Sequence, residues 1–207
     1  VEEHLGVAPR HVGVALALGG LVAEVAPAVD HLLGRAAADA ELQPAAGDQI
    51  RAITEKLQED QLDGSYGTPF TPSFIGMPWG NAAVGARNAI APPLRIERGT
   101  DIASFEVDLR AAYEGPGGRV HGGVIALLLD QLVGEAASTD GLPRFTGTLS
   151  VRYVRPTPLG RVWARAEVTR REGRKSFVTA ELGDAEGPTV TAEAVMITPK
   201  GFELPTE

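Results

Sequence analysis

The stretch HGGVIALLLD, residues 121–130, decides how this 207-residue chain folds, because it joins a pair of glycines to a long apolar run. The apolar residues continue beyond the stretch and leave the helix no wet face, which predicts a buried helix from 122 to about 138. Asp130 stands inside this run, where an ionised carboxylate must find contacts that replace its water. The bulky residues that we expect in the core are Ile125, Leu128, Leu129 and Leu132.

The helix face around Asp130 carries only small residues. Residues three, four and seven positions apart share one face of a helix, so Asp130 would look onto a shallow groove. Two interpretations stay open at this point. Asp130 is either a structural hydrogen-bond partner or a base beside a bound ligand, since both settings perturb carboxylates. Its small neighbours are Gly123, Ala126, Gly134 and Ala137.

The two glycines mark the start of this helix. The first N–H groups of a helix have no partner within it, and a residue without a side chain lets a ligand approach them closely. Gly122 and Gly123 therefore predict a polarising donor on the same helix as the carboxylate of Asp130.

The flanking sequence predicts an antiparallel sheet. Apolar and polar residues alternate over 103–111, as in a half-buried strand, and four more strands are expected after the helix. Short turns between the last three strands predict a meander. The order of one strand, a helix and four strands indicates an α+β fold in which the sheet wraps around the helix. The four later strands are expected at 145–155, 161–170, 175–183 and 189–198.

The chain before this region reads differently. Residues 1–62 predict a helical N-terminal extension, with two helical segments broken near Gln43 and Pro44. Residues 63–94 are rich in Gly and Pro and predict a connecting segment with little regular structure. The sheet-and-helix domain is then expected over 95–200.

Composition narrows the classes of function. The formal net charge of -8 disfavours a nucleic-acid partner, and the absence of cysteine excludes thiol catalysis and disulfides within this chain. Residues 144–175 nevertheless hold nine Lys and Arg against two Asp and Glu, which suggests a local anion site or a solvated strand face. The apolar stretch 12–23 is too short to cross a bilayer, so we expect no membrane partner and a cytoplasmic protein.

Taken together, these motifs resemble the hotdog-fold acyl-CoA thioesterases of the thioesterase superfamily, in particular the Asp-dependent branch with a His-Gly-Gly signature. The resemblance runs from about residue 88 to 197. It implies a hotdog fold, an antiparallel sheet wrapped around a long central helix. The motifs that carry it are APPL at 91–94, GPGGRVHGG at 115–123, Asp130, YVRP at 153–156, GRKSF at 173–177 and TAEA at 191–194.

The resemblance also implies roles for single residues. In this family a main-chain N–H at the helix start polarises the thioester carbonyl, and by position this donor is Gly122, with Gly123 nearby. The helix aspartate, here Asp130, acts as general base or nucleophile, and a hydroxyl on the following strand, here Thr146, helps to place the water or the carboxylate. His121 would help to shape the carbonyl site, or it only closes the turn before the helix.

The implied substrate is an acyl-CoA, with no metal and no further cofactor. The resemblance also implies a homodimer in which Gly122 of one subunit faces Asp130 of the other, and pairing of such dimers into a homotetramer stays open. One position departs from the family, because some relatives have Asn or Gln where this chain has Gly115, so a side chain that orients the carbonyl or water is missing. Candidate contacts to the CoA phosphates are Arg155, Arg171, Arg174 and Lys175.

Two other functions remain as alternatives. One is a hydratase or dehydratase on the same fold that acts on enoyl or hydroxyacyl thioesters, and the other is a non-catalytic acyl-CoA-binding module. The sequence does not decide the acyl group, or whether its carrier is CoA or acyl carrier protein.

Overall fold

The structure is a computed structural model that describes residues 42–59, 67–68, 78–88 and 90–201. The chain divides into two compact units, Val1–Ala91 and Pro92–Glu207. All strands of the described residues lie in the second unit.

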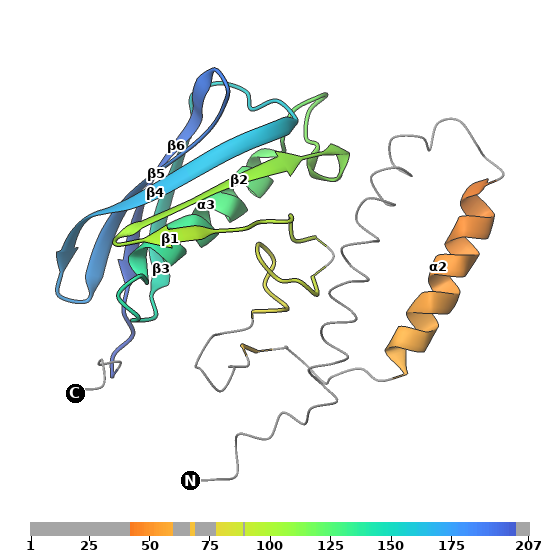
Figure 1. Ribbon diagram of the computed structural model, residues 1–207, viewed down its shortest axis with the longest axis horizontal. Coiled ribbons are helices and arrows are strands. Elements are labelled where there is room, and N and C mark those ends of the chain that lie inside the picture. Colours follow the sequence, from red (N-terminus) through yellow and green to blue (C-terminus); the bar gives the residue numbers. More distant parts are fainter. Residues whose placement is uncertain (1–41, 60–66, 69–77, 89, 202–207) are drawn as a thin grey trace, which may run out of the picture. The chain divides into compact units, whose positions relative to one another are not determined.

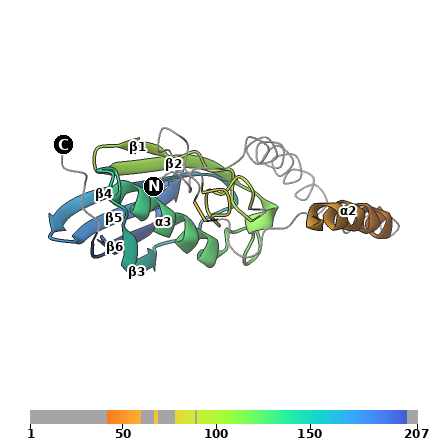
Figure 2. The same cartoon turned by 90° about the horizontal axis from the view of Figure 1, so that it is seen from below.

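The second unit is one six-stranded antiparallel sheet with a long helix, α3 (Gly122–Ala137), against one face (Figure 1). The strands are β1 (Glu97–Gly99), β2 (Ile102–Leu109), β3 (Phe145–Tyr153), β4 (Gly160–Glu172), β5 (Lys175–Asp184) and β6 (Gly187–Ile197). Their order in the sheet is β1-β2-β4-β5-β6-β3. Figure 2 shows the sheet curving around the helix, with β1 and β2 on one side of α3 and β3 on the other. The predicted α+β fold is confirmed.

The meander predicted for the last three strands is also confirmed, since β4 pairs with β5 and β5 with β6, both antiparallel. The position of β3 was not predicted. This strand follows the helix but pairs with β6, and no other strand of the described residues pairs with its second side. β3 is therefore an edge strand, and its outer backbone groups are open to a partner.

Two details of the first strand differ from the prediction. A short extra strand, β1, pairs antiparallel with β2, and β2 ends at Leu109 instead of 111. Leu109 pairs with Gly160, the first residue of β4, so the pairing of β2 with β4 ends there. The chain then forms the 3-10 turn Ala111–Tyr113, which leads towards the start of α3.

The core lies between α3 and the inner face of the sheet. The predicted apolar stripe of the helix is buried, with exposed fractions of 0 to 2%. Each such leucine or isoleucine contributes roughly 1.5–3 kcal/mol of transfer free energy. The sheet meets the helix with many small residues, which lets α3 lie close enough to contact all six strands. These small residues are Ala103, Ala164, Ala166, Ala180, Ala192 and Ala194.

In the first unit the described helix is α2 (Leu42–Gln58). α2 begins at Leu42, directly before the predicted break near Gln43 and Pro44. Pro44 falls in the first turn, where a missing N–H leaves no helical bond unmade. The segment predicted to be helical before residue 42 lies outside the described residues. Within the part of the chain that the structure describes, no helix has the length and apolar character needed to cross a bilayer.

Candidate active site

His121 caps the N-terminus of α3. This residue has extended backbone angles, φ -61° and ψ 130°, and its Nδ1 accepts the N–H of Gly123 at 2.9 Å. The imidazole thus supplies an acceptor for a first-turn N–H that has no partner within the helix. A Cβ on Gly123 would lie 3.1 Å from the same Nδ1, so a side chain at this position would press on the imidazole. Within one protomer His121 is the cap of the helix.

The N–H of Gly122 is the donor left open at this helix end. His121 takes the N–H of Gly123, and Val124 and Ile125 donate to the carbonyl of His121. Among the described residues no acceptor faces the N–H of Gly122. Because the positive end of the helix dipole coincides with this free N–H, the position suits an oxygen that gains negative charge.

Tyr153 is a contact of this helix end that sequence reasoning missed. Its hydroxyl donates to the carbonyl oxygen of Gly122 at 2.7 Å. A Cβ on Gly122 would lie 3.3 Å from the hydroxyl oxygen and 3.4 Å from the ring, closer than most side-chain contacts. A side chain at 122 would therefore need Tyr153 to give way by a few tenths of an ångström. The only signal in the sequence was the motif YVRP, which suggested a strand and gave no contact.

Gly115 lies directly against the backbone of His121. A Cβ on Gly115 would be 2.8 Å from the Cα of His121, a distance that real side chains do not adopt. The N–H of Gly115 donates to Arg119 and the N–H of His121 donates to Tyr113, which hold the loop in this form. The Asn or Gln of some relatives therefore does not fit this backbone, and the loop borders the helix start with main chain instead.

Asp130 lies on the half-exposed side of α3, opposite β3. The hydroxyl of Thr146 donates to its Oδ1 at 2.8 Å. Its second oxygen, Oδ2, accepts no hydrogen bond from any described group. Thr146 thus holds one carboxylate oxygen and leaves the other for a water molecule or for a carbonyl carbon.

A bulge in β3 turns Thr146 towards the helix. The pairing of β3 with β6 shifts between Thr146 and Thr148, and Gly147 is the extra residue. A Cβ on Gly147 would lie 2.6 Å from Cδ1 of Ile197, so a side chain here would need Ile197 to move. Bulges of this kind re-aim neighbouring side chains and are frequent next to active sites.

Gly122 and Asp130 do not meet within one protomer. They are eight residues apart on one straight helix, which corresponds to about 12 Å at 1.5 Å per residue. A carbonyl oxygen and the carbon it belongs to cannot bridge that distance. The two groups can act on one thioester only when they come from different subunits.

Two of the four candidate phosphate contacts are engaged in ion pairs. Arg155 forms a fork on Asp184, with distances of 2.9 and 2.5 Å, and also donates to the carbonyl of Gly187 at 2.8 Å. Its guanidinium lowers the pKa of Asp184 to about 2 through this hydrogen bond. Arg171 bonds to Asp101, to the hydroxyl of Ser176 and to the last turn of α3. Both guanidinium groups are therefore occupied by contacts within the domain.

The four candidates also lie at two different ends of the sheet. Arg155 contacts the β5–β6 turn, whereas the other three belong to the β4–β5 turn. The length of β5 separates these ends by about 30 Å. Arg174 donates to the carbonyl of Thr198 at 3.0 Å, and the exposed Lys175 has no partner among the described residues. One phosphate cannot contact all four within a protomer.

The ion pair of Asp184 predicts a pH-dependent stability. Because its pKa is lowered from 3.8 to about 2, the stability it adds is present above pH 3.8 and is lost as the pH falls towards 2. Asp184→Asn should therefore be less stable than wild type at neutral pH, and the two should converge as the pH falls through this window. Urea unfolding at a series of pH values measures this difference. Asp108→Asn, an exposed carboxylate on β2, is the control. A constant difference between Asp184→Asn and wild type would show that the pair does not act through its charge.

The cap of α3 predicts a second effect on stability. His121→Ala removes the acceptor of the Gly123 N–H and should lower the free energy of unfolding by about 1 kcal/mol. His121→Asn should retain most of the stability, because an Asn oxygen can accept the same N–H. Chemical denaturation of the three proteins measures both changes. Equal stability of all three would show that the imidazole contact contributes nothing to the helix.

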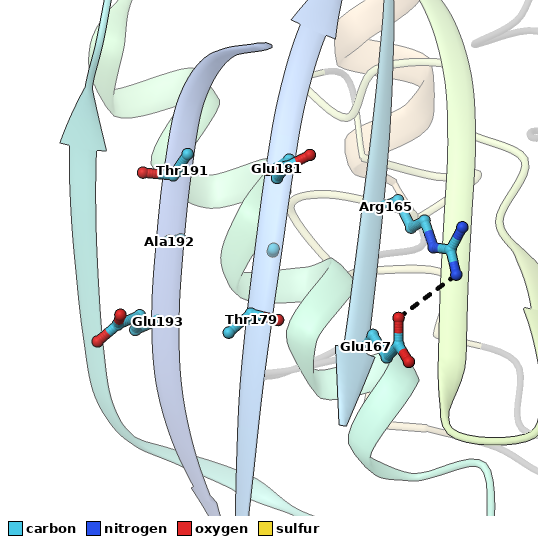
Figure 3. A pocket seen from close by; sticks show the side chains of 8 residues that line it. Arg165, Glu167, Thr179, Glu181, Thr191, Ala192 and Glu193 are labelled. Atoms are coloured by element: carbon cyan, nitrogen blue, oxygen red, sulfur yellow. Dashed lines mark hydrogen bonds and ion pairs between the residues drawn. The ribbon is translucent and has the colours of Figure 1, made fainter. Parts of the chain in front are cut away.

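Among the described residues, a further pocket lies away from the start of α3. Figure 3 shows a shallow groove on the sheet face away from α3, where Arg165 contacts Glu167 at 3.4 Å. Its other polar side chains, Thr179, Glu181, Thr191 and Glu193, point outwards from β5 and β6. Among the described residues, no three His, Asp or Glu side chains gather closely enough to hold a metal ion.

Residues 117–191, which contain the helix start, Asp130 and the first strands after it, match the family model of the thioesterase superfamily. The second unit has the hotdog fold, and within it these residues match this superfamily. Acyl-coenzyme A thioesterase THEM4 of Mus musculus is 33% identical over 104 residues, which are 50% of this chain and 44% of the relative. The matched part thus spans less than half of this curated relative.

Solved structures agree with the hotdog domain. A crystal structure of a thioesterase superfamily protein has a TM-score of 0.75 and 29% identity, and the match covers 87% of this chain and 90% of that one. The PaaI protein of E. coli, from the phenylacetic acid degradation operon, has a TM-score of 0.50 and 17% identity over 52% of this chain and 80% of its own. The second likeness shows the fold alone.

Proposed function

We propose that this hotdog domain hydrolyses an acyl-CoA thioester to a free acid and CoA. The observation that carries the proposal is that α3 holds both a free N–H at Gly122 and a carboxylate, Asp130, whose second oxygen accepts no hydrogen bond from the described residues. The similarity to acyl-coenzyme A thioesterases in sequence supports the choice of substrate.

The chemistry needs two functions from the protein. The N–H of Gly122 donates to the thioester carbonyl oxygen and stabilises the negative charge that develops there. Asp130 supplies the second function through Oδ2. As a general base it takes a proton from water, the hydroxide adds to the carbonyl carbon, the carbon–sulfur bond breaks, and the departing thiolate of CoA takes up a proton. As a nucleophile it adds to the carbon itself, the carbon–sulfur bond breaks, and the CoA thiolate leaves an anhydride behind. Water then hydrolyses this anhydride to the free acid and the Asp130 carboxylate, and the thiolate takes up the proton that is released.

The site requires a second subunit, and the open edge of β3 supplies a surface for it. Large apolar side chains are exposed at both ends of this strand, with exposed fractions of 67% for Phe145, 51% for Tyr153 and 60% for Val154. An edge strand with open backbone groups and apolar ends is a typical place for strand pairing between subunits. We infer a homodimer in which two β3 strands pair antiparallel.

The helices agree with such a twofold axis. If Gly122 of one protomer faces Asp130 of the partner subunit, the axis crosses the two antiparallel helices midway, near Ala126. This residue is small and half-exposed, so two helices can approach closely there.

Contacts of β3 support the same position for the proposed axis. Thr146 contacts Asp130, and Tyr153 contacts Gly122. The two strand residues therefore lie beside the two site residues that the axis must exchange. Their midpoint lies between Leu149 and Ser150. An axis at this point also places Phe145 near the partner's Tyr153, so the exposed apolar ends of both strands cover each other.

Thiol release from a panel of short, long and aromatic acyl-CoAs tests the proposed reaction. We expect stoichiometric free thiol and free acid from at least one class, and parallel assays with acyl carrier protein thioesters identify the carrier. Addition of water to crotonyl-CoA without thiol release would replace the proposal by a hydratase. Saturable acyl-CoA binding without any turnover would replace it by a binding module.

A further inference from the structure

A chain of two hydrogen bonds connects Tyr153 to His121 through one peptide group. The hydroxyl of Tyr153 donates to the carbonyl oxygen of Gly122 at 2.7 Å, and the N–H on the other side of that peptide, from Gly123, donates to Nδ1 of His121 at 2.9 Å. Hydrogen bonds in series polarise one another, so a donor on the peptide oxygen strengthens the N–H at its far end.

This chain fixes the proton on the imidazole. A neutral imidazole donates with one nitrogen and accepts with the other. Because Nδ1 of His121 accepts, the proton is on Nε2, and the bond made by one nitrogen sets the state of the other. His121 is exposed, and among the described residues no group accepts a hydrogen bond from its Nε2–H. The helix start therefore presents two unused donors, the N–H of Gly122 and the Nε2–H of His121.

We propose that Tyr153 is a positioning residue that acts through the Gly122–Gly123 peptide to hold His121 as its Nε2–H form, which then serves beside the Gly122 N–H as a second donor to the thioester carbonyl. This role rests on the proposed hydrolysis. Tyr153 itself touches neither the carbonyl carbon nor Asp130.

The contacts of Tyr153 at the helix start support a positioning role. Its hydroxyl bonds to a helix carbonyl that already belongs to the first turn, and a Cβ on Gly122 would lie 3.4 Å from its ring. Both contacts are made within one protomer.

Kinetics of Tyr153→Phe, which keeps the ring and removes the hydroxyl, test the proposal. We expect kcat to fall by about three- to tenfold, the factor of one neutral hydrogen bond, with KM within about twofold of wild type. In the His121→Ala background the same change should alter kcat by less than about twofold, because the residue it acts through is gone. Thr179→Val, which removes an exposed hydroxyl from β5, is the control and should keep wild-type rates. An unchanged kcat, or an equal effect in both backgrounds, would overturn the proposal.

Nitrogen-15 spectra of the histidine rings give a second readout that does not depend on turnover. The ring of His121 is identified by its loss in His121→Asn. Wild type should show protonated Nε2 and unprotonated Nδ1, and Tyr153→Phe should move the two shifts towards each other and the Gly123 amide proton upfield. Unchanged spectra in Tyr153→Phe would overturn the proposal. Absence of hydrolysis in wild type with the expected spectra would instead contradict the proposed function and with it the carbonyl role of His121.

Discussion

Replacing Asp130 by Asn lowers kcat for acyl-CoA hydrolysis by about 10²- to 10⁴-fold, the range of a positioned base. The amide still accepts the Thr146 hydroxyl through its oxygen, so the contact that places the side chain is retained. What the variant loses is the basic, nucleophilic oxygen at the open Oδ2 position. Stability should therefore change little while turnover collapses.

Thiol release under saturating acyl-CoA, together with urea unfolding, measures both effects. Glu135→Gln is the matched control, because it makes the same change from carboxylate to amide on the same helix, where Glu135 pairs with Arg98 at 2.6 Å. It should keep wild-type turnover. An Asp130→Asn protein that is folded and fully active would show that Asp130 is only a structural partner of Thr146.

Replacing Gly122 by Pro removes the proposed carbonyl donor and should lower kcat by about 10²- to 10³-fold relative to Gly122→Ala. Proline is tolerated at the first helical position because the N–H there has no helical partner. The residue before a proline must be extended, and His121 already has φ -61° and ψ 130°. The backbone therefore accepts the change.

Gly122→Ala is the control because it adds the same Cβ, which meets Tyr153, but keeps the N–H. Any strain from that contact is common to both variants and cancels in the ratio of their kcat values. Circular dichroism and urea unfolding confirm that both remain folded. Equal kcat for the two variants would show that the Gly122 N–H does not bind the carbonyl.

Local sequence patterns predicted the elements of the fold but not their long-range arrangement. The apolar run after His121 was enough for the helix and its buried stripe, and the short turns were enough for the meander. The pairing of β3 with β6 depends on contacts between residues more than 30 positions apart, which no local period encodes. Pro44 lies in the first turn of α2, which tolerates proline, so the helix start at Leu42 stands beside the predicted break.

The site shows the same division. The contact between Thr146 and Asp130 follows the pairing that the family resemblance implied, whereas no pattern pointed to the bond from Tyr153 to Gly122. The ion pair of Arg155 was equally hidden, because its partner lies 29 positions away in the sequence. Residue type suggested a phosphate ligand, but tertiary neighbours decide whether a guanidinium is free.

The central claim is that each active site joins Gly122 of one subunit to Asp130 of the other. A heterodimer of one Asp130→Asn chain and one Gly122→Pro chain, co-expressed with two different tags and purified through both, tests it most directly. One of its two sites then contains both intact groups, so turnover per dimer should recover to about half of wild type. Turnover no higher than that of either mutant homodimer would contradict the account.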